Sequence, residues 1–153
     1  MTITLFEHTT LSFQVVRLDS VLSVSELSRF GALHAEHIDW ARADAIHLID
    51  DALDVSGLDY AQLDKLRESY RALHKKLDFH LLRRSAWVCA NPRAWPFLEY
   101  WLADRHVRDG QSTDVCLVRR LHEASALFDD EELEAVTRWD QFTELYRLHA
   151  PAA

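Results

Sequence analysis

Cysteine is rare in this chain, since only Cys89 and Cys116 occur among its 153 residues. Each lies inside an apolar run rich in strand-forming residues, SAWVCAN and TDVCLVR. A framework of disulfide bonds is therefore not expected, and we predict that both cysteines are buried free thiols. A chain of this length can bury a substantial hydrophobic core without such cross-links.

Long apolar runs and an excess of basic residues are also missing. No run approaches the roughly 20 apolar residues of a membrane-spanning helix. The N-terminus has no basic region followed by an apolar stretch, which a secretory signal would require. Acidic residues outnumber basic ones by 25 to 17, so the formal charge is −8. Because an acidic surface repels phosphates, we do not expect nucleic acid as a partner. Since an apolar span and a secretory signal are missing as well, we expect a soluble cytoplasmic protein that does not insert into a membrane.

What the chain does contain is typical of one globular domain. Hydrophobic residues make up 48% of the sequence, and no internal repeat or long linker is visible. Apolar and β-branched runs predict strands, which we place at residues 3–6, 13–18, 46–49, 83–90 and 113–120. Helical periodicity predicts helices between them, which we place from 24 to about 44, 59–77, about 95–110, 122–128 and 129–149.

This alternation of strands and helices predicts an α/β fold with a largely parallel sheet. The first two strands are joined by a short turn at residues 8–10, which suits an antiparallel hairpin. We therefore expect a four- or five-stranded mixed sheet flanked by helices.

The stretch from 45 to 77 is the clearest unit of the chain. A short apolar run, residues 46–49, predicts a buried strand, and a loop with small polar residues follows it. Asp59 then suits the N-cap of an amphipathic helix, with Gln62 at the capping-box spacing. This unit predicts a strand, a polar loop and a helix that packs back on the sheet.

Three segments resemble STAS domains and the related SpoIIAA-like proteins. They are the opening pair of strands that leads into a helix, the loop DVSGL at 54–58, and the closing strand with its short helix at 115–128. The loop is similar to the Asp-Ser-Ser-Gly-Leu loop of STAS domains. The resemblance covers roughly residues 3–128, so we assign a STAS-like domain to 1–128 and an additional C-terminal helix to 129–150.

This resemblance implies a regulatory role. In anti-sigma-factor antagonists of the family, a partner kinase phosphorylates a serine at the start of the helix that follows this loop. Matching the motifs implies that Ser56 is the phosphoacceptor, between Asp54 and Gly57. The chain departs from the pattern, because Val55 replaces the first serine and Leu58-Asp59-Tyr60 replaces a small apolar helix start. These departures resemble the diverged SpoIIAA-like branch.

Other kinds of site find weaker support in the sequence. Asp50 and Asp51 follow an apolar strand, as the magnesium-binding acids of phospho-receiver domains do, but the phosphoacceptor aspartate on a later strand is missing. His34 and His37 could share a helical face, yet they supply only two of the three ligands that a metal site needs. Cys89 could act as a nucleophile only if it were exposed. We therefore predict neither a catalytic centre nor a metal or cofactor site.

The sequence thus favours a non-enzymatic regulatory or binding module. We expect it to engage a protein partner, such as a kinase-type regulator, through the loop and helix at 54–70, with Asp54, Gly57, Asp59 and Tyr60 as contact residues. The additional C-terminal helix offers a homodimer surface. The alternative is a protein that binds a small apolar ligand, a lipid or metabolite, in a closed pocket of at least about 300 Å³ lined by some of its five tryptophans.

Overall fold

The computed structural model describes residues 3–77, 83–103 and 113–148. Six strands form one sheet in the order β5-β4-β3-β2-β1-β6. Their bounds are β1 Ile3–His8, β2 Phe13–Leu18, β3 Asp44–Ile49, β4 Arg83–Cys89, β5 Thr113–Val118 and β6 Phe142–Leu148. Strands β2 to β5 are parallel neighbours, whereas β1 is antiparallel to both β2 and β6. The predicted mixed α/β sheet is confirmed, but it has six strands instead of four or five.

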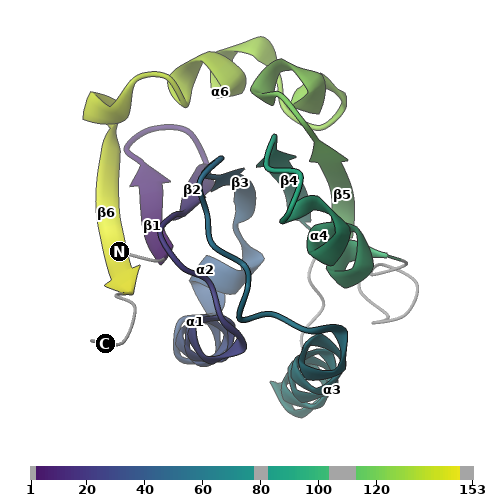
Figure 1. The fold of residues 1–153 in the computed structure, drawn as a ribbon. Helices are drawn as coiled ribbons and strands as arrows, with labels where there is room; N and C mark the ends of the chain where they lie inside the picture. The colour runs from purple at the N-terminus through teal and green to yellow at the C-terminus, as the bar shows by residue number, and fades with distance from the viewer. Residues whose placement is uncertain (1–2, 78–82, 104–112, 149–153) are drawn as a thin grey trace.

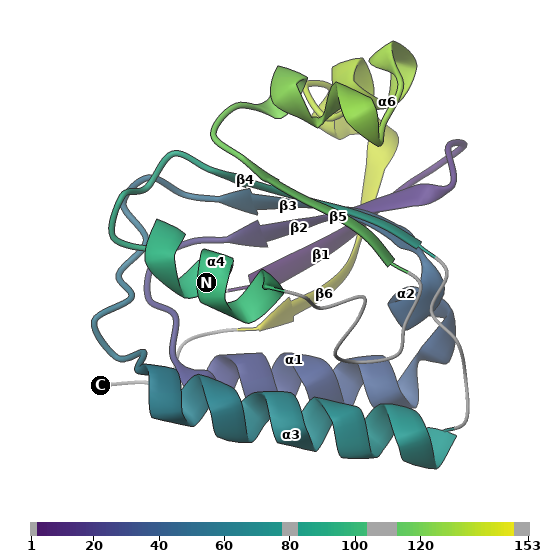
Figure 2. The ribbon, with the colours of Figure 1, turned by 90° about the vertical axis from the view of Figure 1, so that its right-hand side faces the viewer.

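The described helices between the parallel strands cover one face of the sheet. Their bounds are α1 Val24–Glu36, α2 Ile38–Arg42, α3 Tyr60–Leu77 and α4 Trp95–Leu102. Crossover connections between parallel strands are right-handed. When the strands also follow each other across the sheet in chain order, these crossovers put their helices on the same face. Figure 2 shows α1, α3 and α4 together on that side. The opposite face therefore needs a separate cover.

Two local features position the helices of this layer. The predicted helix from 24 to 44 is divided at His37, whose backbone angles are not helical, into α1 and α2. Gly31 allows α1 to approach α3 closely, because a Cβ atom at this position would lie 2.5 Å from the Tyr70 ring. The Tyr70 hydroxyl donates a hydrogen bond to the Leu27 carbonyl at 2.9 Å, so the close approach is fixed by a polar contact.

The predicted helix at 129–149 is wrong. Up to residue 148, where the description ends, only α6 (Asp130–Ala135) is helical, and a 3₁₀ turn and the edge strand β6 follow it. The apolar spacing of this segment suggested a helix. Without β6, however, β1 would be the edge strand of the sheet, and residues 142–148 pair with its backbone instead. A bulge between Leu5 and Phe6 in the β1–β6 register absorbs the irregular spacing. The homodimer surface expected on this helix loses its basis with it.

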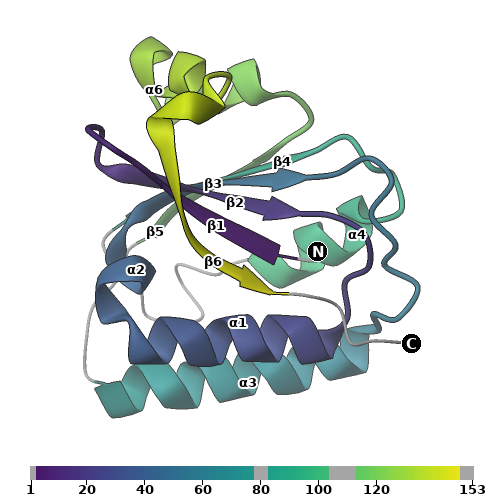
Figure 3. The same ribbon diagram turned by 90° about the vertical axis from the view of Figure 1, so that its left-hand side faces the viewer.

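The C-terminal segment provides the missing cover. After β5 the chain forms a 3₁₀ helix, η1 (Leu121–Ala126), then α6 and η2 (Trp139–Gln141), and reaches the far edge as β6. Figures 1 and 3 show this segment crossing the face that lies opposite α1 and α3. It buries a second apolar cluster, which contains Phe13, Val15, Ile46, Ala86, Ala124, Phe128, Leu133, Ala135 and Val136. No helix within the described ranges is long and apolar enough to cross a membrane.

Arg84 of β4 joins the sheet to this cover. Its guanidinium donates to both Glu132 oxygens, at 2.8 and 2.7 Å, and to Asp44 Oδ2 at 3.0 Å. It also donates to the Leu127 carbonyl and lies 4.5 Å from the centroid of the Phe128 ring. Hydrogen bonding from Arg84 is the main cause of the lowered pKa of Glu132. The pair is therefore charged at neutral pH and fixes α6 against the sheet.

We expect Arg84→Ala to lower the free energy of unfolding by about 2 kcal/mol, because the substitution leaves two partly buried carboxylates without their cation. Chemical denaturation measures this loss. The matched control is Arg138→Ala, whose ion pair with Glu134 is exposed, 58% and 64%, and should contribute about 0.5 kcal/mol or less.

The pH dependence of the same comparison is a further check. Because the pKa of Glu132 is depressed in the folded state, the stabilisation is complete above its ordinary value of 4.5. It is lost as the pH falls through the lower, folded value. A stability difference between wild type and Arg84→Ala that does not shrink in acid would contradict this assignment.

Candidate functional site

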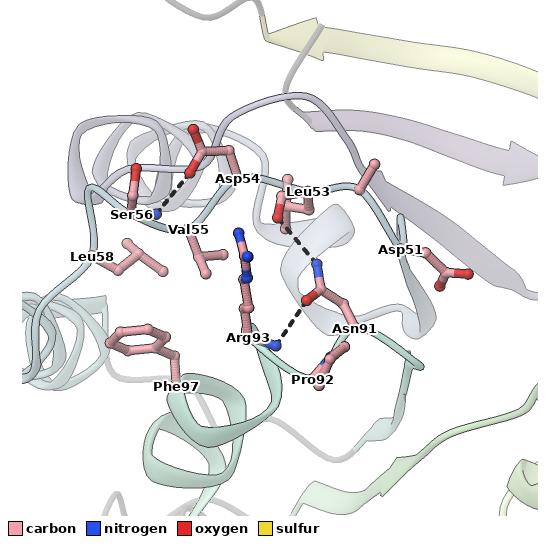
Figure 4. Close-up of a pocket in the computed structure, with 11 residues that line it drawn as sticks. Asp51, Leu53, Asp54, Val55, Ser56, Leu58, Asn91, Pro92, Arg93 and Phe97 are labelled. Carbon is pink, nitrogen blue, oxygen red and sulfur yellow. Dashed lines mark hydrogen bonds between the residues drawn. The ribbon is translucent and has the colours of Figure 1, made fainter.

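The most structured polar region lies where the parallel strands β3 and β4 end. The loops that follow them, residues 50–59 and 90–94, enclose an open pocket of about 530 Å³ (Figure 4). Its lining residues are Asp51, Ala52, Leu53, Asp54, Val55, Ser56, Leu58, Asn91, Pro92, Arg93 and Phe97. The carboxyl ends of parallel strands are a frequent ligand-binding position in open α/β sheets.

Asn91 holds the two loops together. Its side chain is 3% exposed, and its Nδ2 donates to the carbonyls of Leu53 at 3.1 Å and Asp50 at 3.4 Å. Its Oδ1 accepts the backbone N–H groups of Arg93 at 2.9 Å and Ala94 at 3.2 Å. Figure 4 shows this amide between the Leu53 backbone and Arg93. One buried side chain therefore sets the distance between both walls of the pocket.

A third loop, between β2 and α1, holds the other side of the site. The Asp54 N–H donates to the Ser20 carbonyl at 2.8 Å, and the Leu22 N–H donates to the Asp54 carbonyl at 2.9 Å. Val21 and Asp54 form an isolated parallel bridge. Ser20 adopts a positive φ of 67° to make this connection. The loop that carries Asp54 is thus fixed on two sides and presents a preformed surface.

Asp54 and Ser56 face solvent on this fixed loop. The Ser56 N–H donates to Asp54 Oδ1 at 2.9 Å, which closes a tight turn. This hydrogen bond lowers the pKa of Asp54, followed by a contribution from the Ser56 hydroxyl and a weaker one from the positive charge of Arg93. Asp54 therefore remains a carboxylate well below neutral pH, with Ser56 beside it.

The expected position of Ser56 at a helix start is wrong. Asp59 is the residue that caps α3, because its Oδ1 accepts the Gln62 N–H at 2.7 Å, as the sequence predicted. Ser56 lies four residues before Tyr60, where α3 begins. A phosphate on Ser56 would therefore lie beside the Asp54 carboxylate, not on the amides of the first helical turn.

The loop does not need a glycine at position 57 for its backbone conformation or for space. Gly57 does not occupy the left-handed region, and a Cβ added to it would meet only the Ser23 Cβ at an ordinary 3.8 Å. The residue in this neighbourhood that does adopt a positive φ is Ser20.

Two exposed apolar side chains border the site. Tyr60, the first residue of α3, is 45% exposed and stacks on Phe97 with a centroid distance of 5.0 Å. Its ring also meets the edge of Tyr100 at 4.8 Å. Val21, next to the Asp54 bridge, is 43% exposed. The site thus combines carboxylates with accessible apolar surface on one fixed framework.

Sequence reasoning assigned Asp54, Ser56, Asp59 and Tyr60 to this region, and all four lie around it. The Asn91 side chain accepts the N–H groups of Arg93 and Ala94 in the turn that precedes α4, whose first residue is Trp95. The sequence did not indicate that Asn91, Arg93 and Phe97 belong to this site. The available signal was that β3 and β4 follow each other in a parallel sheet, so the residues after both strands must meet.

The other predicted groups occupy structural positions. The His34 ring meets Phe30 at 4.3 Å, and His37 stacks on Trp40 at 3.8 Å. Within the ranges that the structure describes, no three His, Cys, Asp or Glu side chains are arranged to hold a metal ion.

The two thiols are free, as the sequence predicted. Cys89 is fully buried, whereas Cys116 is only partly buried, so the expectation of burial holds in full for Cys89 alone. Burial raises the pKa of both thiols. Neither residue therefore has the lowered pKa of a reactive cysteine.

The tryptophans do not line the pocket at the end of β3 and β4. Trp87 is buried and stacks on His47 at 3.8 Å, whereas Trp139 is 38% exposed on the opposite layer. Phe97 is the aromatic residue in the described lining of the pocket, which is open to solvent. This pocket is larger than about 300 Å³, but it lacks the closed, tryptophan-lined character expected for an apolar ligand.

Comparisons with protein-family models, curated proteins and solved structures found no match for the chain.

We expect Asn91→Ala to lower the free energy of unfolding by about 2 kcal/mol, because it leaves buried carbonyl and N–H groups unpaired. Hydrogen exchange of the amides at 53–58 should accelerate, since the loop loses its tether to β4. Asn91→Asp is the matched variant, because it retains the acceptor for Arg93 and Ala94 but loses the donor to Leu53. Unchanged exchange in both variants would show that Asn91 does not fix the loop.

Proposed function

We propose that the protein is a non-enzymatic, STAS-like regulatory or binding module that docks a protein partner at the end of β3 and β4. The observation that carries the proposal is the fixed loop around Asp54, which presents an ionised carboxylate beside exposed apolar side chains. An interface with a preformed backbone loses little conformational entropy on binding. Large aromatic side chains such as Tyr60 are frequent anchors of protein–protein contacts.

The order of elements also supports the STAS-like part of the proposal. The resemblance implied an opening pair of strands before a helix, a strand–loop–helix unit, and a closing strand with a short helix. The chain contains these units as β1-β2-α1, β3-loop-α3 and β5-η1. β6 is an addition to the sheet beyond these units.

Charge indicates the chemistry of the partner. Asp50, Asp51, Asp54 and Asp59 are all exposed on the loop, whereas Arg93 is the basic residue in the described lining of the pocket. The protein as a whole carries a formal charge of −8. We therefore infer a partner segment with Lys or Arg side chains for the acidic loop and an apolar side chain for the Tyr60–Phe97 surface.

Binding suits this site better than catalysis. Ser56 is the exposed hydroxyl of the pocket, and Asp54 beside it is held as a carboxylate. The described pocket lining contains no histidine that could accept the serine proton during acyl transfer.

Site-specific crosslinking tests the docking surface. A photoreactive phenylalanine analogue in place of Tyr60 should crosslink one partner in cells, because Tyr60 borders the pocket. The crosslinked peptide should contain basic residues, and Asp54→Asn should weaken the crosslink several-fold. The matched control replaces Tyr146, a tyrosine of β6 with a similar exposure of 37%. Equal crosslinking at both positions, or none at position 60, would refute the proposal.

We also expect Ser56 to act as a switch. A phosphate adds roughly two negative charges, and repulsion from Asp54 would break the turn that Ser56 closes. Fragmentation of the native protein across residues 45–65 should locate the phosphate on Ser56. Phosphoserine placed genetically at 56 should reduce crosslinking at position 60, whereas phosphoserine at the exposed Ser125 on η1 should not. Crosslinking that is unaffected by phosphoserine 56 would exclude the switch.

A further inference from the structure

The two walls of the pocket at the end of β3 and β4 carry charges of opposite sign. One wall is the loop after β3, which presents the carboxylate of Asp54. The other wall is the turn that leads into α4, from which Arg93 lines the same pocket. Figure 4 shows the Arg93 side chain reaching from this turn toward the Asp54 loop. A molecule in the pocket therefore meets an acidic side and a basic side.

The guanidinium of Arg93 is exposed and available to a ligand. Among the residues that the structure describes, none accepts a hydrogen bond from it or forms an ion pair with it. The backbone N–H of Arg93 donates to Asn91 Oδ1 at 2.9 Å, which fixes the base of the side chain. The Ser56 N–H is the main cause of the lowered pKa of Asp54, and the charge of Arg93 is the smallest of the causes. Arg93 is thus held at its backbone and keeps its side-chain donors for a partner.

An apolar surface lies directly beside this guanidinium. Arg93 and Phe97 both line the pocket and are four residues apart, a spacing that makes side chains neighbours on a helix. The backbone of Ala94 between them is already helical, with φ −79° and ψ −29°. The loop wall adds Val55 and Leu58, which are buried apolar residues of the lining. A side chain that fills the apolar part of the pocket therefore lies next to the Arg93 charge.

We propose that the partner segment carries an acidic side chain that pairs with Arg93, in addition to the basic and apolar side chains inferred above. This inference rests on the proposed function and adds the specificity of the same site. A guanidinium binds a carboxylate through two parallel N–H···O hydrogen bonds, which fix orientation as well as charge. Asp54 repels an acid and Arg93 repels a base, so a segment of mixed charge fits in one direction and is rejected in the reverse one.

Selection of random dodecapeptides on phage against the immobilised full chain tests this pairing. Wild type should enrich peptides in which a basic, an apolar and an acidic residue keep a constant spacing. Arg93→Glu should enrich peptides in which Lys or Arg replaces the acidic residue and the apolar residue is retained. The matched control is Arg138→Glu, which changes the net charge equally at an arginine of the C-terminal cover that is 58% exposed. This control should enrich the wild-type pattern.

A synthetic peptide of the wild-type pattern measures the size of the effect. It should bind Arg93→Glu roughly tenfold or more weakly than wild type. Replacement of its acidic residue by Lys should restore binding to this variant. Arg93→Gln removes the charge without adding repulsion, so it should weaken binding of the original peptide by a smaller factor.

The outcomes separate this inference from the docking function. Enrichment of basic and apolar residues without an acidic residue would overturn the inference and leave the docking function intact. The same pattern on Arg93→Glu as on wild type would also overturn the inference alone. Absence of any common pattern on wild type would overturn both.

Discussion

The whole architecture depends on one topological constraint, which is that β2 to β5 follow each other in spatial order. Each connection then puts its helix on the same face, and the other face is left without a helical layer. The C-terminal segment covers that face, and Arg84 is the polar contact that fixes this cover to the sheet. The guanidinium reaches Asp44 at the start of β3 and Glu132 in α6, so it joins two neighbouring strands and the cover at one point. The same guanidinium lies over the Phe128 ring at the edge of the second apolar cluster, and the chain runs on from this segment into the edge strand β6.

The same constraint creates the site at the ends of β3 and β4. Parallel neighbours deliver their loops to one edge, and there Asn91 converts two separate loops into a single surface. The pairing of Asp54 with Ser20 and Leu22 adds a third loop. Rigid loops, an ionised carboxylate and an exposed Tyr60 together favour recognition of a partner over chemistry on a substrate. In the function that we propose, a charge added at Ser56 would act locally, through repulsion from Asp54, on the loop that would contact the partner.

The order of elements could be predicted from the sequence because strand and helix periods differ clearly in most segments. Helix α3 is a clear case, since Asp59 marks its start and the apolar spacing after Asp59 is that of a single amphipathic helix. The structure of the C-terminal segment could not be predicted. The apolar spacing of residues 129–149 suits a helix, and only the position of β1 at the edge of the sheet shows that part of this segment can pair with it as a strand. The position of Ser56 was wrong for a different reason. It was placed at the start of the helix by the resemblance of its motif, whereas the spacing of this chain already assigned the cap to Asp59. The role of Asn91 required knowledge of which strands are neighbours.

The two edges of the parallel strands are held by different kinds of polar contact. At the edge where β3 and β4 end, the buried Asn91 amide is hydrogen-bonded on both its nitrogen and its oxygen by backbone groups of two loops, so this edge has a preformed surface. At the opposite edge, Asp44 lies at the start of β3 and is paired with Arg84. The guanidinium that fixes the C-terminal cover therefore also compensates a carboxylate at this second edge. A loss of Arg84 thus affects the cover and the start of β3 together.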